Sequence, residues 1–303
     1  MLEELEIKTF QNKIYLFYKK QARIFPWRDT TDPYRILISE LMLQQTQAQR
    51  VIPKYSAFIK VFPNWQSLHK ASFQDVLKLW SGLGYNRRAI YLKNAAGIIV
   101  TKYNGKTPKT VEELMSLPGI GFNTASAICA FAYNQPVVFI ETNIRSVFIN
   151  EFSPILNGWP DWRGSQNTRT HSSGSMIWDE GGTGPVYKYE VHDNDILPLI
   201  EQTLDTKDPR AWYWALLDYG NFLKKTLPNP SRLSQHYKKQ SKFEGSDRQL
   251  RGKILKMLTN KGMVNIKDIA LQLSKDVEKV KEISSELQKE GFIKKRSNTL
   301  SIS

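Results

Sequence analysis

The sequence predicts a mainly α-helical protein of about two domains, and three observations support this. Apolar residues recur every three or four positions over most of the first 150 residues, which is the periodicity of amphipathic helices. Prolines and glycines interrupt these stretches, and alternating β-branched runs joined by hairpin dipeptides are missing there. The length of 303 residues, 41% of them hydrophobic, is enough for two domains with substantial cores.

The periodicity places helices in the order 7–17, 36–43, 51–62, 73–79 and 90–103, and again at 196–204 and 212–223. Residues 157–184 differ, because they are crowded with Gly, Ser, Thr and Asn and show no periodicity. A structureless loop of that length is unusual inside a compact domain. We therefore expect a flexible, solvated insertion within a helical domain that spans 1–232.

The C-terminal part has a different pattern. A basic, polar stretch with prolines predicts a linker at 233–245. Three short helical patterns follow at 247–258, 266–273 and 277–287, and then FIKKRSNTLSIS reads as a small β-hairpin. Residues 246–303 thus predict a winged helix-turn-helix. It could bind duplex DNA through its third helix, 276–289, or its basic wing; a partner-binding module and a stabilising accessory bundle are the alternatives.

Composition narrows the class of protein. The net charge of +14 indicates a polyanionic partner such as nucleic acid. One cysteine excludes an intramolecular disulfide and any site that needs several thiolates, and the four histidines lack metal-ligand spacing, so no metal site is expected. The first 20 residues do not resemble a signal peptide, and no apolar run approaches ~18 residues. A cytoplasmic, nucleoid-associated protein with no membrane partner is expected.

The most specific local motif is LPGIGFNTASAICAF at 117–131. Gly119 and Gly121 permit positive φ and close backbone approach, while Ile120 between them can fill the core. The amides that open the following helix then form a site for a phosphate. This predicts a helix-hairpin-helix, with an ordinary tight turn between helices as the alternative.

Two carboxylates are candidates for catalysis. Glu40 interrupts an apolar stretch whose desolvation would raise its pKa toward that of a general acid, although such a residue is more often an ordinary solvated one. Glu141 and Asn143 stand where an apolar segment turns into a helix, and from composition alone a capping role is the better interpretation.

The strings FPWR, DPYRILISELMLQQTQ, VIPKY, LWSGLGYNRRA and LPGIGFNTASAI resemble, in this order, those of the helix-hairpin-helix DNA glycosylases of the endonuclease III superfamily. The likeness is greatest to the glycosylases that remove adenine opposite guanine or 8-oxoguanine. It is strong over about 20–152 and weak over 190–230. It implies a two-lobed helical fold, a monomeric enzyme that acts on duplex DNA with a mismatched or damaged base pair, and a target nucleotide flipped into a pocket.

The resemblance also assigns roles to individual residues. Glu40 matches the acid that protonates the leaving purine, and Glu141, oriented by Asn143, matches the carboxylate that stabilises the oxocarbenium-like sugar. Gln45 matches the residue that fills the space of the flipped base, with Gln44 a second candidate, and Trp27 and Arg28 match the base-pocket entrance. The expected DNA contacts are completed by Arg87, Arg88, Gly119, Ile120, Gly121, Asn123 and Thr124.

The sequence departs from the family pattern in four places. Glu141 replaces the usual aspartate, which displaces the charge by one methylene. Asn123 stands where bifunctional members have lysine, so Schiff-base lyase chemistry at that residue is excluded. The four-cysteine loop is absent, so no iron–sulfur cluster is expected; a monovalent cation at the hairpin is left open. The oxidised-guanine reading domain is replaced by the winged helix.

The expected function is removal of adenine from a mismatch by a monofunctional glycosylase. The departures at Asn123 and Glu141 keep a second enzyme open, a glycosylase for thymine or uracil opposite guanine. The alternative from another class is a non-catalytic DNA-binding or regulatory protein that supports the winged helix.

Overall fold

The computed structural model describes residues 2–152, 156, 175–178, 185–188, 190–239 and 242–303. Contacts divide the chain into two compact units. The first unit comprises Met1–Ile24 and Cys129–Lys239, and the second comprises Phe25–Ile128 and Gln240–Ser303. The chain therefore starts in the first unit, crosses to the second at Phe25 and returns within one helix at Cys129.

The second unit begins with a helical lobe. Its first helix, α2 (Pro33–Leu43), is capped by Asp32, whose carboxylate accepts from the Tyr34 N–H. Pro33 occupies the first helical position, where proline is favoured. The lobe contains α2 (Pro33–Leu43), α3 (Ala48–Val61), α4 (Trp65–Lys70), α5 (Phe73–Trp80), α6 (Arg87–Lys102), α7 (Val111–Met115) and the start of α8 (Phe122–Tyr133). Helix α2 packs on α3 and α6, and α4 packs on α6.

The first unit is built around α9 (Thr142–Phe152), which packs against α10 (Asp193–Thr203), α11 (Pro209–Thr226) and the short 3-10 helix η1 (Pro230–Leu233). Phe10 from α1 joins its core, with ring centroids 5.5 Å from Phe148, 4.9 Å from Phe152 and 5.7 Å from Trp212. Edge-to-face rings at such distances stabilise a core beyond their buried area. The elements are α1 (Glu4–Gln21), the end of α8, α9 (Thr142–Phe152), α10 (Asp193–Thr203), α11 (Pro209–Thr226) and η1 (Pro230–Leu233).

A two-stranded sheet corrects one expectation. Strand β1 (Ser175–Trp178) pairs antiparallel with β2 (Pro185–Lys188), although the sequence predicted no regular element at 157–184. Four-residue strands leave too little alternation for a periodicity argument. The rest of the expected insertion, 157–174 and 179–184, lies outside the described residues, so its flexibility stays a prediction.

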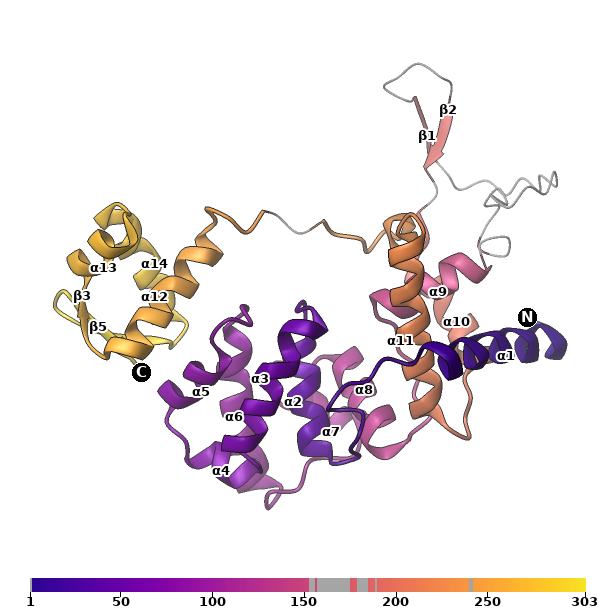
Figure 1. The fold of residues 1–303 in the computed structure, drawn as a ribbon, viewed down its shortest axis with the longest axis horizontal. Coiled ribbons are helices and arrows are strands. Elements are labelled where there is room, and N and C mark those ends of the chain that lie inside the picture. Colours follow the sequence, from indigo (N-terminus) through magenta and orange to yellow (C-terminus); the bar gives the residue numbers. More distant parts are fainter. Residues whose placement is uncertain (1, 153–155, 157–174, 179–184, 189, 240–241) are drawn as a thin grey trace. The chain divides into compact units, whose positions relative to one another are not determined.

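The C-terminal segment forms the expected winged helix-turn-helix (Figure 1). Its helices are α12 (Asp247–Lys261), α13 (Ile266–Leu273) and α14 (Val277–Lys289). The wing strands β4 (Ile293–Arg296) and β5 (Thr299–Ile302) pair as a hairpin, and β3 (Val264–Asn265), which the sequence did not indicate, pairs with β5. The fold class predicted from the sequence is confirmed.

The segment predicted as a linker starts in contact with the first unit. The Val191 N–H donates to Leu233 O at 2.9 Å, and the Gln235 N–H donates to Val191 O at 3.2 Å. The boundaries 1–232, 233–245 and 246–303 themselves stay a prediction. Among the described helices, none is long and apolar enough to span a bilayer.

Candidate active site

Glu40 lies in the last turn of α2, a mostly buried helix. Its neighbours Leu37, Ile38 and Leu41 are fully buried, whereas Glu40 itself is partly exposed. Its backbone carbonyl accepts from the Gln44 N–H at 3.3 Å, which closes the last turn of α2. The apolar face therefore anchors α2 in the lobe and leaves Glu40 partly exposed.

The turn after α2 separates the two glutamine candidates. Gln45 is exposed and has a φ of +51°, a conformation that non-glycine residues rarely adopt and that often marks functional sites. Gln44 instead donates from Nε2 to Thr124 Oγ1 at 3.1 Å and to Gly119 O at 3.4 Å. Gln44 thus ties this turn to the hairpin, whereas Gln45 is the exposed one of the two glutamines.

Arg88 is buried beneath the same turn and donates hydrogen bonds to it. The sequence analysis expected Arg88 to contact a phosphate, and its burial corrects that expectation. It is 5% exposed, and its guanidinium donates to acceptors of the chain itself at 2.7–3.2 Å. Its neighbour Arg87 is exposed and pairs with Glu290 at 2.8 Å. Arg88 is therefore a positioning residue. Its acceptors are Leu41 O, Met42 O, Gln44 O, Thr46 Oγ1, Gly84 O and Tyr85 O.

We expect Arg88→Ala to lower the free energy of unfolding by about 2–4 kcal/mol, because it leaves several buried carbonyls without a donor. The matched variant Arg87→Ala removes an exposed ion pair and should cost less than about 1 kcal/mol. Urea unfolding of both variants measures the difference. Equal costs would contradict the positioning role.

The hairpin has the expected positive φ at Gly119 but not at Gly121. Gly119 has a φ of +77°, and Ile120 is 5% exposed and fills the core. The Ala125 N–H donates to Gly121 O at 2.9 Å, so the amides that precede Ala125 at the start of α8 are those that a helix leaves without intrahelical acceptors. Asn123 is exposed beside them and Thr124 is partly exposed. This arrangement suits a phosphate.

The two hairpin glycines have different requirements. A Cβ on Gly119 would lie 2.5 Å from Tyr91 Cδ2, whereas one on Gly121 would meet nothing within 4 Å. We expect Gly119→Ala to cost about 2 kcal/mol or more of stability, and Gly121→Ala less than about 0.5 kcal/mol. Gly121→Ala should still weaken duplex binding, because its methyl group occupies the phosphate approach.

Thermal unfolding and duplex binding titrations of both variants test this prediction. Wild-type affinity in Gly121→Ala would remove Gly121 from the DNA interface.

The structure distinguishes the two residues expected at the base pocket. Trp27 is 6% exposed and lies between Phe25, at 4.9 Å between stacked rings, and Tyr55, at 5.5 Å. Its surroundings favour a core role. Arg28 is partly exposed, with its guanidinium 5.1 Å from the Phe25 ring centroid, and remains the candidate for contact with a ligand.

Glu141 caps helix α9, as composition suggested. Its Oε1 accepts from the N–H groups of Asn143 at 2.7 Å and Ile144 at 3.2 Å, and Asn143 Nδ2 donates to Oε2 at 3.4 Å. These donors and the positive end of the helix dipole fix a carboxylate in place. The cap does not compete with a catalytic role, because Glu141 remains partly exposed. Glu40 belongs to the second unit and Glu141 to the first.

Two residues near Glu141 were missed by the sequence analysis. Gly220 on α11 lets α9 approach closely, since a Cβ there would lie 2.1 Å from Asn143 O. Lys224 is half-buried; burial lowers the pKa of its ammonium, the Glu141 charge raises it and Arg23 lowers it. A glycine inside a helical pattern indicates close packing, but the sequence does not show against what.

The segment after α11 does not fit an iron–sulfur cluster. Four thiolates are needed, yet the only cysteine is Cys129, which is buried in α8. The segment is instead held by the backbone pairing to Val191 and by Asp193, which accepts from Arg145 Nε and Nη2 at 2.7 Å each and lies 3.8 Å from His236 Nε2. The described residues contain no group of three or more His, Cys, Asp or Glu that could hold a metal ion.

Comparisons with known proteins agree with this geometry. Residues 38–154 match the HhH-GPD superfamily of base excision DNA repair proteins. The adenine DNA glycosylase of Mycobacterium tuberculosis (strain H37Rv) is 32% identical over 246 residues, which cover 80% of this chain and 76% of that protein. The adenine DNA glycosylase of Buchnera aphidicola (subspecies Baizongia pistaciae) is 40% identical over 148 residues, or 49% of this chain and 42% of that protein.

Two solved structures share the fold. A thermostable thymine-DNA glycosylase has a TM-score of 0.56 at 22% identity and covers 77% of this chain and 96% of its own. An endonuclease III trapped covalently on DNA has a TM-score of 0.53 at 15% identity, covering 73% and 88%. The fold and the matched residues define a base excision DNA repair protein of the HhH-GPD superfamily. Within it, the chain belongs to the family of the adenine DNA glycosylases, which confirms the sequence prediction of family and enzyme class.

Proposed function

We propose that this chain is a monofunctional DNA glycosylase that hydrolyses the N-glycosidic bond of adenine mispaired with guanine or oxidised guanine. It acts as a monomer on duplex DNA in the cytoplasm or nucleoid, and without an iron–sulfur cluster. Relatives at 31–40% identity carry the name adenine DNA glycosylase. The chain spans 42% of the Buchnera relative and about three quarters of the mycobacterial ones.

One observation within the second unit carries the proposal. The side chain of Gln44 connects the turn that exposes Gln45 to the hairpin that we propose binds a phosphate. The acid at Glu40 precedes that turn by one helical turn. An acid, a residue that can fill the vacated space and a phosphate site are thus joined within one unit. A glycosylase that flips its base needs these three functions together.

The chemistry follows the two-carboxylate logic of glycoside hydrolysis. Glu40 donates a proton to the purine leaving group, so that the base departs neutral. The Glu141 carboxylate, oriented by Asn143, stabilises the positive charge that develops on the sugar, and water then adds at C1′. Asn123 offers no amine, so the product is an abasic site rather than a broken strand.

The purified full chain should be assayed on duplexes with one labelled strand that carry A·G, A·8-oxoguanine, A·C, T·G, U·G and A·T pairs. We expect strand breaks at adenine opposite guanine or 8-oxoguanine, and only after hot alkali. Release of thymine or uracil instead would establish the alternative substrate. No base release from any duplex would refute the proposal and leave a DNA-binding protein.

A further inference from the structure

A basic groove lies within the second unit, with a volume of about 930 Å³. One wall is the Gln44–Gln45 turn together with Arg50 and the 81–86 turn, and the other is α12 of the winged helix. Seven of its lining residues are basic and one, Glu290, is acidic. The basic residues are Arg50, Arg87, Arg88, Arg248, Arg251, Lys253 and Lys256.

Not all seven charges are available to a ligand. Arg88 is buried in the turn, and Arg87 and Arg251 both pair with Glu290, at 2.8 and 2.6 Å. Lys253 and Lys256 are exposed, and neither forms an ion pair with a carboxylate of the described residues. The groove therefore keeps a positive surface on its α12 wall.

Contacts hold α12 in this place. Gln74 Nε2 donates to Thr259 O at 3.0 Å, and Arg248 donates to Tyr85 OH at 3.2 Å. The rings of Phe73 and Phe292 lie 6.1 Å apart. Because these contacts join α5 and the 81–86 turn to the winged helix, the α12 lysines and the Gln45 turn face one common space.

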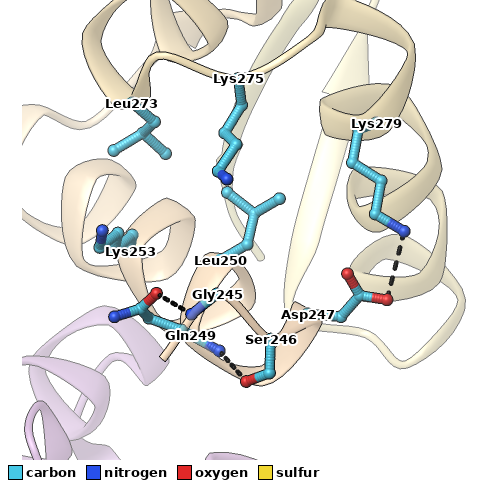
Figure 2. Close-up of a pocket in the computed structure, with 9 residues that line it drawn as sticks. All are labelled: Gly245, Ser246, Asp247, Gln249, Leu250, Lys253, Leu273, Lys275 and Lys279. Carbon is cyan, nitrogen blue, oxygen red and sulfur yellow. Dashed lines mark hydrogen bonds and ion pairs between the residues drawn. The ribbon is translucent and has the colours of Figure 1, made fainter. Parts of the chain in front are cut away.

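The third helix of the winged helix, α14, was a candidate for duplex binding in the sequence, but its charges make it a poor surface for DNA. Lys279 pairs with Asp247 at 3.2 Å and with Glu282 at 3.0 Å, and Lys281 pairs with Glu278 at 2.7 Å. Figure 2 shows Lys279 reaching Asp247 at the start of α12. Two of its three lysines are therefore paired with carboxylates, and only Lys289 is exposed without such a pair among the described residues, so α14 presents a surface of mixed charge to a phosphate backbone.

We propose that the winged helix binds the DNA backbone through its first helix, α12, and that Lys253 and Lys256 contact duplex phosphates in the groove beside Gln45. The charge of the groove favours DNA as its ligand. Its lining is rich in lysine and arginine, and its single carboxylate, Glu290, is already paired with arginines, so the groove is complementary to a chain of phosphates. The inference rests on the proposed function, because it takes the Gln45 turn as a DNA-facing element. The winged helix then extends the DNA surface of the glycosylase lobe.

The test uses the full chain and a fluorescent duplex with one A·G mismatch, titrated at several salt concentrations. We expect Lys253→Ala/Lys256→Ala to weaken binding about 10-fold near 0.1 M salt and to reduce the slope of log K against log salt by about 2, because two phosphate contacts are lost. The matched variant Lys19→Ala/Lys20→Ala removes the same charge from the exposed end of α1 in the first unit and should leave the slope unchanged.

An unchanged slope in the α12 variant, or an equal loss in both variants, would overturn the proposal. The wild-type base-release assay keeps this result separate from the proposed function. If the wild type releases adenine while the α12 variant binds normally, only the α12 contact is wrong. If the wild type releases no base yet the α12 variant loses salt-dependent binding, the contact stands and the glycosylase assignment fails.

Discussion

Glu40→Gln should slow release of adenine by about 10³-fold, within the range of about 10²–10⁴ that a positioned general acid contributes. The amide keeps the size of the side chain and its place at the end of α2, but it has no acidic proton for the departing purine. The fully buried neighbours Leu37, Ile38 and Leu41 are unaltered, so the helix should fold as before. Single-turnover assays with enzyme in excess measure the rate of base release.

Two controls make the result specific to proton donation. Duplex affinity should stay within about 2-fold of wild type, because Glu40 is not one of the basic groups that neutralise phosphates. Unfolding in urea should also change by less than about 0.5 kcal/mol. A variant that releases adenine at the wild-type rate would show that Glu40 is not the acid.

The helical fold was predictable because its signals are local and repeated. Helix α2 illustrates this: its apolar periodicity, Asp32 cap and Pro33 are all visible in the sequence. The winged helix could be predicted equally well, from three helical patterns followed by a basic turn. Strand β3 was not, because its two residues, Val264 and Asn265, are strand only through pairing with β5.

The roles of adjacent site residues were harder to predict, because they depend on long-range contacts. Gln44 and Gln45 look alike in sequence, and only the hydrogen bonds of Gln44 to the hairpin separate them. Arg87 and Arg88 likewise differ only in which side of α6 meets the turn after α2. The α12 lysines carry no motif, and their relevance comes from the groove they share with Gln45.

Glu141 has two roles that mutation can separate. Its Oε1 caps α9 through the N–H groups of Asn143 and Ile144, and its negative charge is the proposed partner of the sugar cation. A glutamine keeps an oxygen acceptor for the cap and removes the charge. An aspartate keeps the charge with a side chain shorter by one methylene.

We therefore expect Glu141→Gln to fold normally and to lose about 10²–10³-fold in the single-turnover rate of adenine release, as expected for loss of one group aimed at transition-state charge. Glu141→Asp should retain the rate to within about 10-fold, because α9 can still orient its carboxylate through Asn143. Glu141→Ala should lose the rate and also about 1 kcal/mol of stability, because the cap is gone. If Glu141→Gln instead released adenine at the wild-type rate while Glu141→Ala was destabilised, Glu141 would be a helix cap only, and the sugar cation would need a different carboxylate.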